Sequence, residues 1–287
     1  MRKQFKNTVF DIAKIDRKLI LVFGDISIYL FKDFWELFPT RFYNMGICEN
    51  TLISVAAGLS SQGFHAFVHS INPFITDRSL EQIKLDMCYN QFGGNIVTTG
   101  ASFDYAWDGA THHCYGDLAM MRMLPYSEVT QPGSKKELDV LIRSQYNNGK
   151  TTYYRLSDHP HEYDFDVEFG KGVVVKNTSS DITVMTAGPI LGNVMDACRS
   201  LDVNLVYFHT IKPIDKELIS SFKETKILII HDAHGLQEAI NEVPGLNMYH
   251  RGLPYDKFET CYGTVHDIRK KMGLDVASLQ SFVESHL

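Results

Sequence analysis

The chain has 287 residues, of which 44% are hydrophobic, and its mean hydropathy is −0.14. These values are typical of a soluble globular protein with one to three domains. The net charge of −6 and the pI near 6.0 differ from the basic footprint of nucleic-acid-binding proteins, so we expect no nucleic-acid partner.

The cysteines and the apolar runs indicate where the protein resides. The five cysteines are odd in number, widely spaced and without a CxxC pair, which predicts reduced thiols and neither a disulfide framework nor a zinc site. No apolar run approaches the ~20 residues of a membrane span, and the N-terminus is too charged for a secretory signal. We therefore expect a cytoplasmic protein with no membrane partner.

Strands and helices are expected to alternate along the first half of the chain. Helical patterns cover residues 4–16, 49–60, 76–91, 117–125 and 134–148, and strand patterns cover 18–27, 64–71, 94–101, 127–133 and 150–157. Residues 34–46 are expected to form a loop or short helix and then a strand. This alternation predicts a parallel sheet covered by helices on both faces.

A second alternating set follows an acidic stretch with Pro160 and no apolar periodicity. Its expected strands are 181–188, 203–211 and 226–233, its expected helices are 189–201, 215–223 and 235–243, and residues 273–287 form a closing helix. The fold class is therefore predicted as α/β with two parallel-sheet domains, residues 1–165 and 166–287.

Chemistry is expected in the loops that follow the strands, because open parallel sheets bind ligands at the carboxyl ends of their strands. The stretch "AWDGATHHCYGD" places Asp108, His112 and His113 in one such loop. These side chains can relay protons or hold a polyhydroxylated substrate. Their spacing matches no recognised zinc site, and a purely structural loop is the alternative.

Three further residues have both a structural and a functional interpretation. Glu49 opens the small, apolar stretch "GICENTLISVAAGLS", where either the helix start or a ligand must satisfy its charge. Arg155 follows "TTYY", where it either forms a surface ion pair or binds phosphate or carboxylate. Phe74 belongs either to the core or to a ligand site.

Three motifs in order resemble the C-terminal half of the transketolase family, which includes deoxyxylulose-5-phosphate synthase. "GICENTLISVAAGLS" is similar to the family's G-I-x-E segment, "DGATHH" to D-G-x-T-H-Q, and "HTIKPID" to a stretch of its last domain. The resemblance implies a pyrimidine-binding domain for thiamine diphosphate, followed by the smaller transketolase C-terminal domain.

The resemblance also implies roles for individual residues. Glu49 would hydrogen-bond the aminopyrimidine ring, and Phe74 and Asp25 would complete the cofactor-binding set. Glu49 and His112 would be catalytic. The substrate would be bound by Asp108, His112, His113 and Arg155, with Arg2 as a weaker match to a second phosphate-binding arginine.

The sequence departs from the family pattern at two positions and lacks one motif. His113 stands where the family usually has Gln, and Gly100 stands where the synthases have Arg. These departures cast doubt on a simple phosphorylated aldehyde acceptor and leave an unusual sugar, including a nucleotide-linked one, open as donor or acceptor. The G-D-G…N motif that binds magnesium and the diphosphate has no match. The resemblance therefore implies an N-terminal transketolase-like partner subunit that carries Mg²⁺ and the diphosphate, in a 2+2 heterotetramer.

The predicted function is the C-terminal subunit of a split transketolase that moves a two-carbon ketol unit between sugars or sugar phosphates. Two alternatives stay open. One is the beta subunit of a 2-oxoacid dehydrogenase, although such an enzyme has no need of the polyol-handling loop around Asp108. The other is a subunit without catalytic activity that scaffolds its partner.

Overall fold

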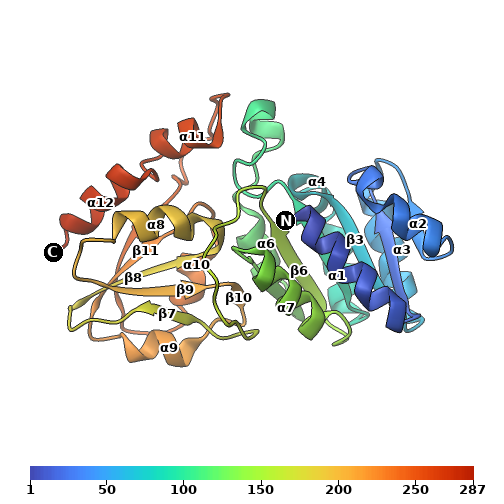
Figure 1. Ribbon diagram of the computed structural model, residues 1–287, viewed down its shortest axis with the longest axis horizontal. Helices are drawn as coiled ribbons and strands as arrows, with labels where there is room; N and C mark the ends of the chain where they lie inside the picture. The colour runs from blue at the N-terminus through green and yellow to red at the C-terminus, as the bar shows by residue number, and fades with distance from the viewer.

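The computed structural model describes all 287 residues as two α/β halves that lie side by side (Figure 1). The first half comprises α1 (Arg2–Ile15), β1 (Leu19–Phe23), α2 (Lys32–Leu37), β2 (Phe42–Asn44), α3 (Glu49–Ser61), β3 (His65–Ile71), α4 (Asn72–Thr76), α5 (Leu80–Gln82), β4 (Gly94–Thr99), α6 (Asp117–Met123), β5 (Ser127–Thr130), α7 (Lys135–Gln145) and β6 (Thr151–Leu156). The second half comprises β7 (Val173–Lys176), β8 (Ile182–Ala187), α8 (Leu191–Ala197), β9 (Asn204–Phe208), β10 (Thr210–Lys212), α9 (Lys216–Ser221), β11 (Lys226–Ile230), α10 (Leu236–Ile240), β12 (Asn247–Arg251), α11 (Val265–Lys271) and α12 (Val276–Glu284).

The first sheet has seven strands in the order β10-β5-β6-β4-β3-β1-β2, and only β10 runs antiparallel to its neighbour. Helices α1, α2 and α7 pack on one face through a core that includes Phe5, Phe34 and Leu141. Helices α3 and α6 pack on the other face through Leu52 and Met121, among others. Both faces are therefore covered, as predicted for a parallel sheet.

The second sheet has five strands in the order β12-β11-β8-β9-β7, with β7 antiparallel at one edge. Helices α8, α11 and α12 contribute Val194, Ile268 and Leu279 to the core of one face. Helices α9 and α10 contribute Ile219 and Ala239 to the other. The predicted fold class, α/β with two sheets that are largely parallel, is confirmed.

The two halves share one strand pairing and one core. Strand β10 comes from the second half but pairs with β5 of the first sheet, Thr210 opposite Thr130 and Lys212 opposite Val129. The core cluster that contains Val129 continues into the second half. The predicted boundary at 165/166 lies in the segment between β6 and β7, which contains no helix or strand, and it stays a prediction.

The structure differs from the expected elements in several places. The strand expected over 203–211 is divided into β9 and β10, and α11 was not predicted. The helix predicted over 76–91 is divided: Thr76 ends α4, and α5 is followed by a π-helix, Ile83–Tyr89, whose winding no contact explains. The edge strands β7 and β12 were not predicted from the sequence. Both are partly exposed: β7 has only three valines in a row, and β12, Asn-Met-Tyr-His-Arg, has no continuous apolar run of the length that marks a buried strand.

None of the helices is both long enough and apolar enough to cross a lipid bilayer.

Candidate functional site

Several residues singled out from the sequence lie after strands of the first sheet, at its carboxyl edge. Glu49 is the first residue of α3, which follows β2, and Phe74 lies in α4, directly after β3. Asp108 lies within, and His112 directly follows, a 3₁₀ segment, Ala106–Thr111, beyond the end of β4. Because β1 to β4 run parallel, their carboxyl ends meet at one edge and bring these loops together.

Glu49 is buried with 1% of its surface exposed, and its charge is compensated by an arginine side chain. Its Oε2 accepts a hydrogen bond of 2.7 Å from Nη1 of Arg78. The carboxylate also stands at the N-terminus of a 13-residue helix, where the helix dipole favours negative charge. The question raised by the sequence has a direct answer: in this chain, an ion pair satisfies the buried carboxylate.

Arg78 connects Glu49 to the aromatic residues of the site. Its guanidinium lies over the Phe74 ring, with Cζ 4.7 Å from the ring centroid. The Phe74 ring in turn meets the His112 imidazole edge-on at 5.1 Å between centroids. Glu49, Arg78, Phe74 and His112 therefore form a continuous row, which we call the edge cluster.

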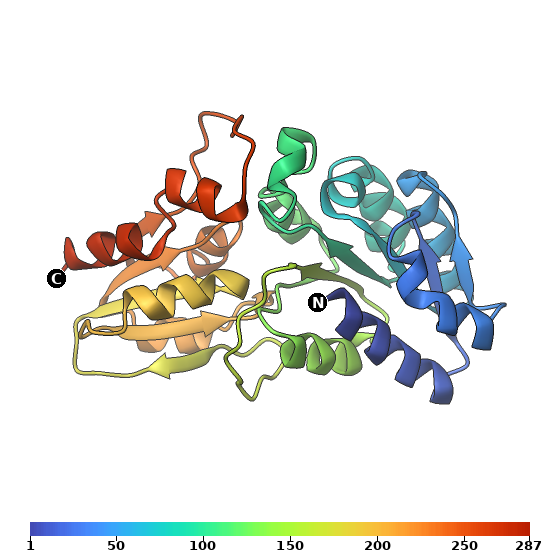
Figure 2. The ribbon, with the colours of Figure 1, turned by 45° about the horizontal axis from the view of Figure 1, so that its top comes forward.

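The loop that carries His112 is held by contacts from both halves of the chain. Nδ1 of His112 lies 2.9 Å from the Thr111 hydroxyl, while Asp108 is exposed. Gly109 has a φ of +73°, and a Cβ there would lie 2.5 Å from the ring of Tyr262, so the position requires glycine. Figure 2 shows the segment between β12 and α11, which carries Tyr262, beside this loop.

Asp25 lies at the same edge of the sheet but outside the edge cluster. Its backbone N–H donates to Oδ1 of Asn44 at 3.0 Å, and Nδ2 of Asn44 donates back to Oδ1 of Asp25 at 2.9 Å. These bonds join the turn after β1 to the end of β2. The cofactor-binding role predicted for Asp25 stays a prediction.

His113 points away from the edge cluster although it is adjacent to His112. Its ring packs edge-on against Phe103, 5.1 Å between centroids, and Phe103 belongs to the core of the second half. Burial lowers the pKa of His113, which favours the neutral imidazole. The structure therefore does not bring His113 together with Phe74 and Glu49.

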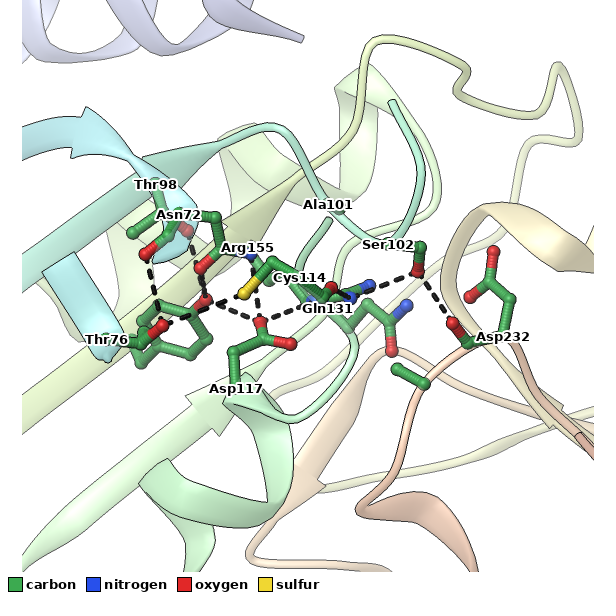
Figure 3. A network of polar contacts seen from close by, with 12 residues as sticks. Asn72, Thr76, Thr98, Ala101, Ser102, Cys114, Asp117, Gln131, Arg155 and Asp232 are labelled. Carbon is green, nitrogen blue, oxygen red and sulfur yellow. Dashed lines mark hydrogen bonds and ion pairs between the residues drawn. The ribbon is translucent and has the colours of Figure 1, made fainter. Parts of the chain in front are cut away.

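The expected surface position of Arg155 requires a correction, because the structure buries its side chain at the carboxyl end of β6. Its side chain is 1% exposed, and its Nε donates to Oδ2 of Asp117 at 2.7 Å. Its Nη2 donates to the Ser102 hydroxyl at 3.1 Å and to the Cys114 carbonyl at 2.8 Å (Figure 3). Burial alone would lower the pKa of Arg155, but the Asp117 and Asp232 carboxylates outweigh it and raise that pKa.

The interior network around Arg155 extends into both halves of the chain. Oδ2 of Asp117 also accepts from the Tyr153 hydroxyl at 2.6 Å and from Nδ2 of Asn72 at 3.0 Å. On the other side, the Ser102 hydroxyl donates to the Asp232 carbonyl of the second half at 2.8 Å (Figure 3). With these partners Arg155 positions the loop after β4, and the phosphate-binding role predicted for it stays a prediction.

Gly100 leaves no room for a larger side chain. It has a φ of +90°, and a Cβ there would lie 2.5 Å from the Tyr105 ring. An arginine at this position would therefore require both a strained backbone and a displaced tyrosine. The departure noted in the sequence is matched by the way Tyr105 packs.

Two residues of the site were missed in the sequence analysis. Arg78 lies in a stretch interpreted only as helix, and no local pattern distinguishes it from other surface arginines. Tyr262 lies in a loop of the second half, 153 positions after Gly109 in the chain. No group of three or more His, Cys, Asp or Glu side chains lies close enough to hold a metal ion.

Comparisons with known proteins identify the family and agree with the fold. Residues 1–158 match the transketolase pyrimidine-binding domain family. An apulose-4-phosphate transketolase subunit of Phocaeicola vulgatus is 27% identical, over 96% of this chain and 93% of that protein. A putative transketolase C-terminal section of Methanocaldococcus jannaschii is 28% identical, over 97% and 93% respectively.

A solved structure shows the same architecture over the whole chain. It is described as a split-gene transketolase in an inactive beta4 tetramer, and it matches with a TM-score of 0.87 and 25% identity, over 99% of this chain and 97% of that one. With a family match over more than half of its residues, the chain belongs to the transketolase family and is a subunit of the split-transketolase type.

Proposed function

We propose that this chain is the C-terminal subunit of a split, thiamine-diphosphate-dependent transketolase that transfers a two-carbon ketol unit between sugars. The partner subunit would hold Mg²⁺ and the diphosphate. When bound, the coenzyme supplies an electron sink for cleavage of a carbon–carbon bond. The relatives named as a transketolase subunit and as a putative transketolase C-terminal section support this assignment.

The observation that carries the proposal is the pairing of a buried carboxylate with an accessible aromatic ring. Glu49 is 1% exposed, and the Arg78 guanidinium lies between its carboxylate and the partly exposed ring of Phe74. A carboxylate in such a low-dielectric setting makes a strong hydrogen bond to a ring nitrogen. Glu49 would hold the aminopyrimidine by its edge, while Phe74 would pack against its face.

The residues beyond Phe74 suit a polyhydroxylated substrate. His112 can exchange a proton with the reacting oxygen, because its ring is partly exposed and contacts Phe74. The exposed carboxylate of Asp108 can accept hydrogen bonds from sugar hydroxyls. The relative named for apulose-4-phosphate suggests a branched or otherwise uncommon sugar phosphate as the substrate class.

An exposed apolar groove on the first half supports a partner subunit. The groove, of about 430 Å³, is lined by Ile28, Tyr29, Lys32, Trp35, Glu36 and Pro39. Tyr29 is 97% exposed and Trp35 53%. Large exposed apolar side chains in one patch mark protein interfaces. We propose that the diphosphate-binding subunit covers this groove in the 2+2 assembly.

The test is Glu49→Gln in the complex reconstituted with the diphosphate-binding subunit. Ketol transfer should fall by about a hundredfold or more, because the amide cannot take the place of the carboxylate at the ring nitrogen. Affinity for thiamine diphosphate should also fall, as measured by calorimetry. The matched control is Glu217→Gln on α9, since the Glu217 side chain is 91% exposed and lies outside the site. Near-normal transfer by Glu49→Gln would contradict the proposal.

The two alternative functions give different results in the same complex. Decarboxylation of pyruvate without ketol transfer would indicate a 2-oxoacid dehydrogenase subunit. Absence of any thiamine diphosphate binding would indicate a scaffold without catalytic activity.

A further inference from the structure

The side chain of Arg78 fills the space between the two groups proposed to bind the pyrimidine ring. Its Nη1 lies 2.7 Å from Oε2 of Glu49, and its Cζ lies 4.7 Å from the centroid of Phe74. A flat ring that stacks on Phe74 and hydrogen-bonds Glu49 needs the volume that this guanidinium occupies. A ring on that face of Phe74, bonded to Oε2 of Glu49, and the guanidinium would therefore exclude each other.

The guanidinium also has the same chemistry as the ring that would replace it. It is planar, delocalised and rich in N–H donors, so it can donate to a carboxylate while it lies against an aromatic face. An aminopyrimidine held by Glu49 and Phe74 would make these two kinds of contact. Arg78 therefore forms, within the chain, the pair of interactions expected of the cofactor.

Only the end of the Arg78 side chain is free to move. Its backbone carbonyl accepts from Nδ2 of Asn50 at 2.9 Å, and the same amide group donates to Oε1 of Gln82 at 2.8 Å. These bonds fix the turn before α5 to the first turn of α3. The Arg78 side chain is nevertheless 47% exposed, so the guanidinium is already partly hydrated and has an open path into solvent.

The pairing also matters for the empty subunit. Glu49 has only 2% of its side chain exposed while Arg78 covers it, and a carboxylate in such a position without a partner is destabilising. Arg78 provides that partner from a flexible surface position. The contact is therefore stabilising before the cofactor arrives and competes with the cofactor when it enters.

We propose that Arg78 is a built-in placeholder for the pyrimidine ring, which holds Glu49 and covers Phe74 in the empty subunit and leaves when the cofactor binds. This inference rests on the proposed function of Glu49 and Phe74. It assigns Arg78 a role in setting cofactor affinity through competition, which makes it a positioning residue and not a catalytic one.

The decisive experiment measures two quantities with opposite expected signs in Arg78→Gln. In the complex with the diphosphate-binding subunit, thiamine diphosphate should bind about three- to tenfold more tightly, because an exposed ion pair and a cation–π contact no longer compete. In the isolated chain, the thermal unfolding midpoint should fall, because Glu49 loses its partner. Calorimetric titration and thermal denaturation supply the two readouts.

Other roles of Arg78 would produce different pairs of signs. A purely structural arginine would lower stability and weaken cofactor binding together, and an arginine that contacts the bound cofactor would weaken binding with little change in stability. Either result would overturn the placeholder. Arg78→Lys, which keeps the charge but loses the planar stack, should bind the cofactor with intermediate affinity, and it serves as the second variant if Arg78→Gln folds poorly.

The matched control is Arg143→Gln. The Arg143 side chain is 42% exposed and pairs with Asp139 and Asp11 on the outer face of α7 and α1. Cofactor affinity should be unchanged in this variant. If the wild-type complex binds no thiamine diphosphate, or if Glu49→Gln leaves its affinity unchanged, the proposed function itself fails. A cofactor-loaded complex in which Arg78 still contacts Glu49 contradicts the placeholder alone.

Discussion

The molecule contains two carboxylate–arginine pairs of the same chemistry and of opposite character. Asp117 and Arg155 are 0% and 1% exposed, and every partner of the pair comes from the interior of the protein. Glu49 is equally buried, but its partner Arg78 is 47% exposed and reaches it from the surface. We call the first pair closed, because both side chains are buried, and the second pair open, because its arginine is reached by solvent. Only in the open pair can a ligand take the place of the arginine.

The largest difference between the pairs should appear when each arginine is removed. Arg155→Met leaves Asp117 buried without its cation, so the free energy of unfolding should fall by about 3–5 kcal/mol. Arg78→Met should cost less, about 1 kcal/mol, because removing a side chain that is 47% exposed opens the Glu49 carboxylate to water. Urea denaturation of both variants measures the contrast.

A double variant separates the charge effect from the loss of packing. Asp117→Asn combined with Arg155→Met should recover part of the lost stability, because no buried charge remains unpaired. Equal costs for Arg155→Met and Arg78→Met would remove the distinction between a closed and an open pair.

Two buried histidines should make the free energy of unfolding depend on pH. Burial lowers the pKa of His69 to about 4, against the bond that its ring makes to the Val97 carbonyl, and it also lowers that of His231 to about 4. The unfolded chain takes up these protons below pH 6.5 and the folded chain does not, so stability present above pH 6.5 is lost as the pH falls toward 4.

The size of this effect is set by the number of protons involved. Each histidine should contribute a slope of about 1.4 kcal/mol per pH unit between its two pKa values. His69→Gln should therefore lower the slope of unfolding free energy against pH by about one proton in this window, as measured by urea denaturation from pH 4.5 to 7. An unchanged slope would show that His69 is protonated in the folded chain.

The smallest expected effect concerns salt. Raising the ionic strength from about 0.1 to 1 M shortens the Debye length from about 10 to 3 Å. The stability difference between the wild type and Arg78→Met should therefore shrink by a few tenths of a kcal/mol, because this guanidinium is accessible to ions. The difference for Arg155→Met should not change. A salt-dependent cost at Arg155 would indicate that ions reach the interior network.

The same contrast explains which parts of the site were predictable from the sequence. Glu49 and His112 lie in short motifs and Phe74 was singled out by the family resemblance, and the structure places all three in the edge cluster. The order of strands and loops in the sequence is enough to predict this grouping, because each residue lies in a segment that follows a strand of the same parallel sheet. Their roles toward cofactor and substrate remain proposals.

Where the sequence analysis fell short, the deciding contact joins distant parts of the chain. Arg155 looks like an edge residue until Asp117, 38 positions earlier, is seen to bury it. Arg78 acquires meaning only through Glu49, 29 positions away. His113 resembles a second active-site histidine, yet it packs on Phe103. Side-chain direction in such cases is set by tertiary packing, which a single sequence does not display.

The pairing of β10 with β5 has a mechanical consequence. A strand of the second half completes the first sheet, and the hydrophobic core runs continuously beneath it, so a rotation of one half against the other would break both. We therefore expect the two halves to move together as one body and not to open and close about a hinge. An opening that admits a ligand would then come from side chains at the rim, such as Arg78, or from movement of the proposed partner subunit.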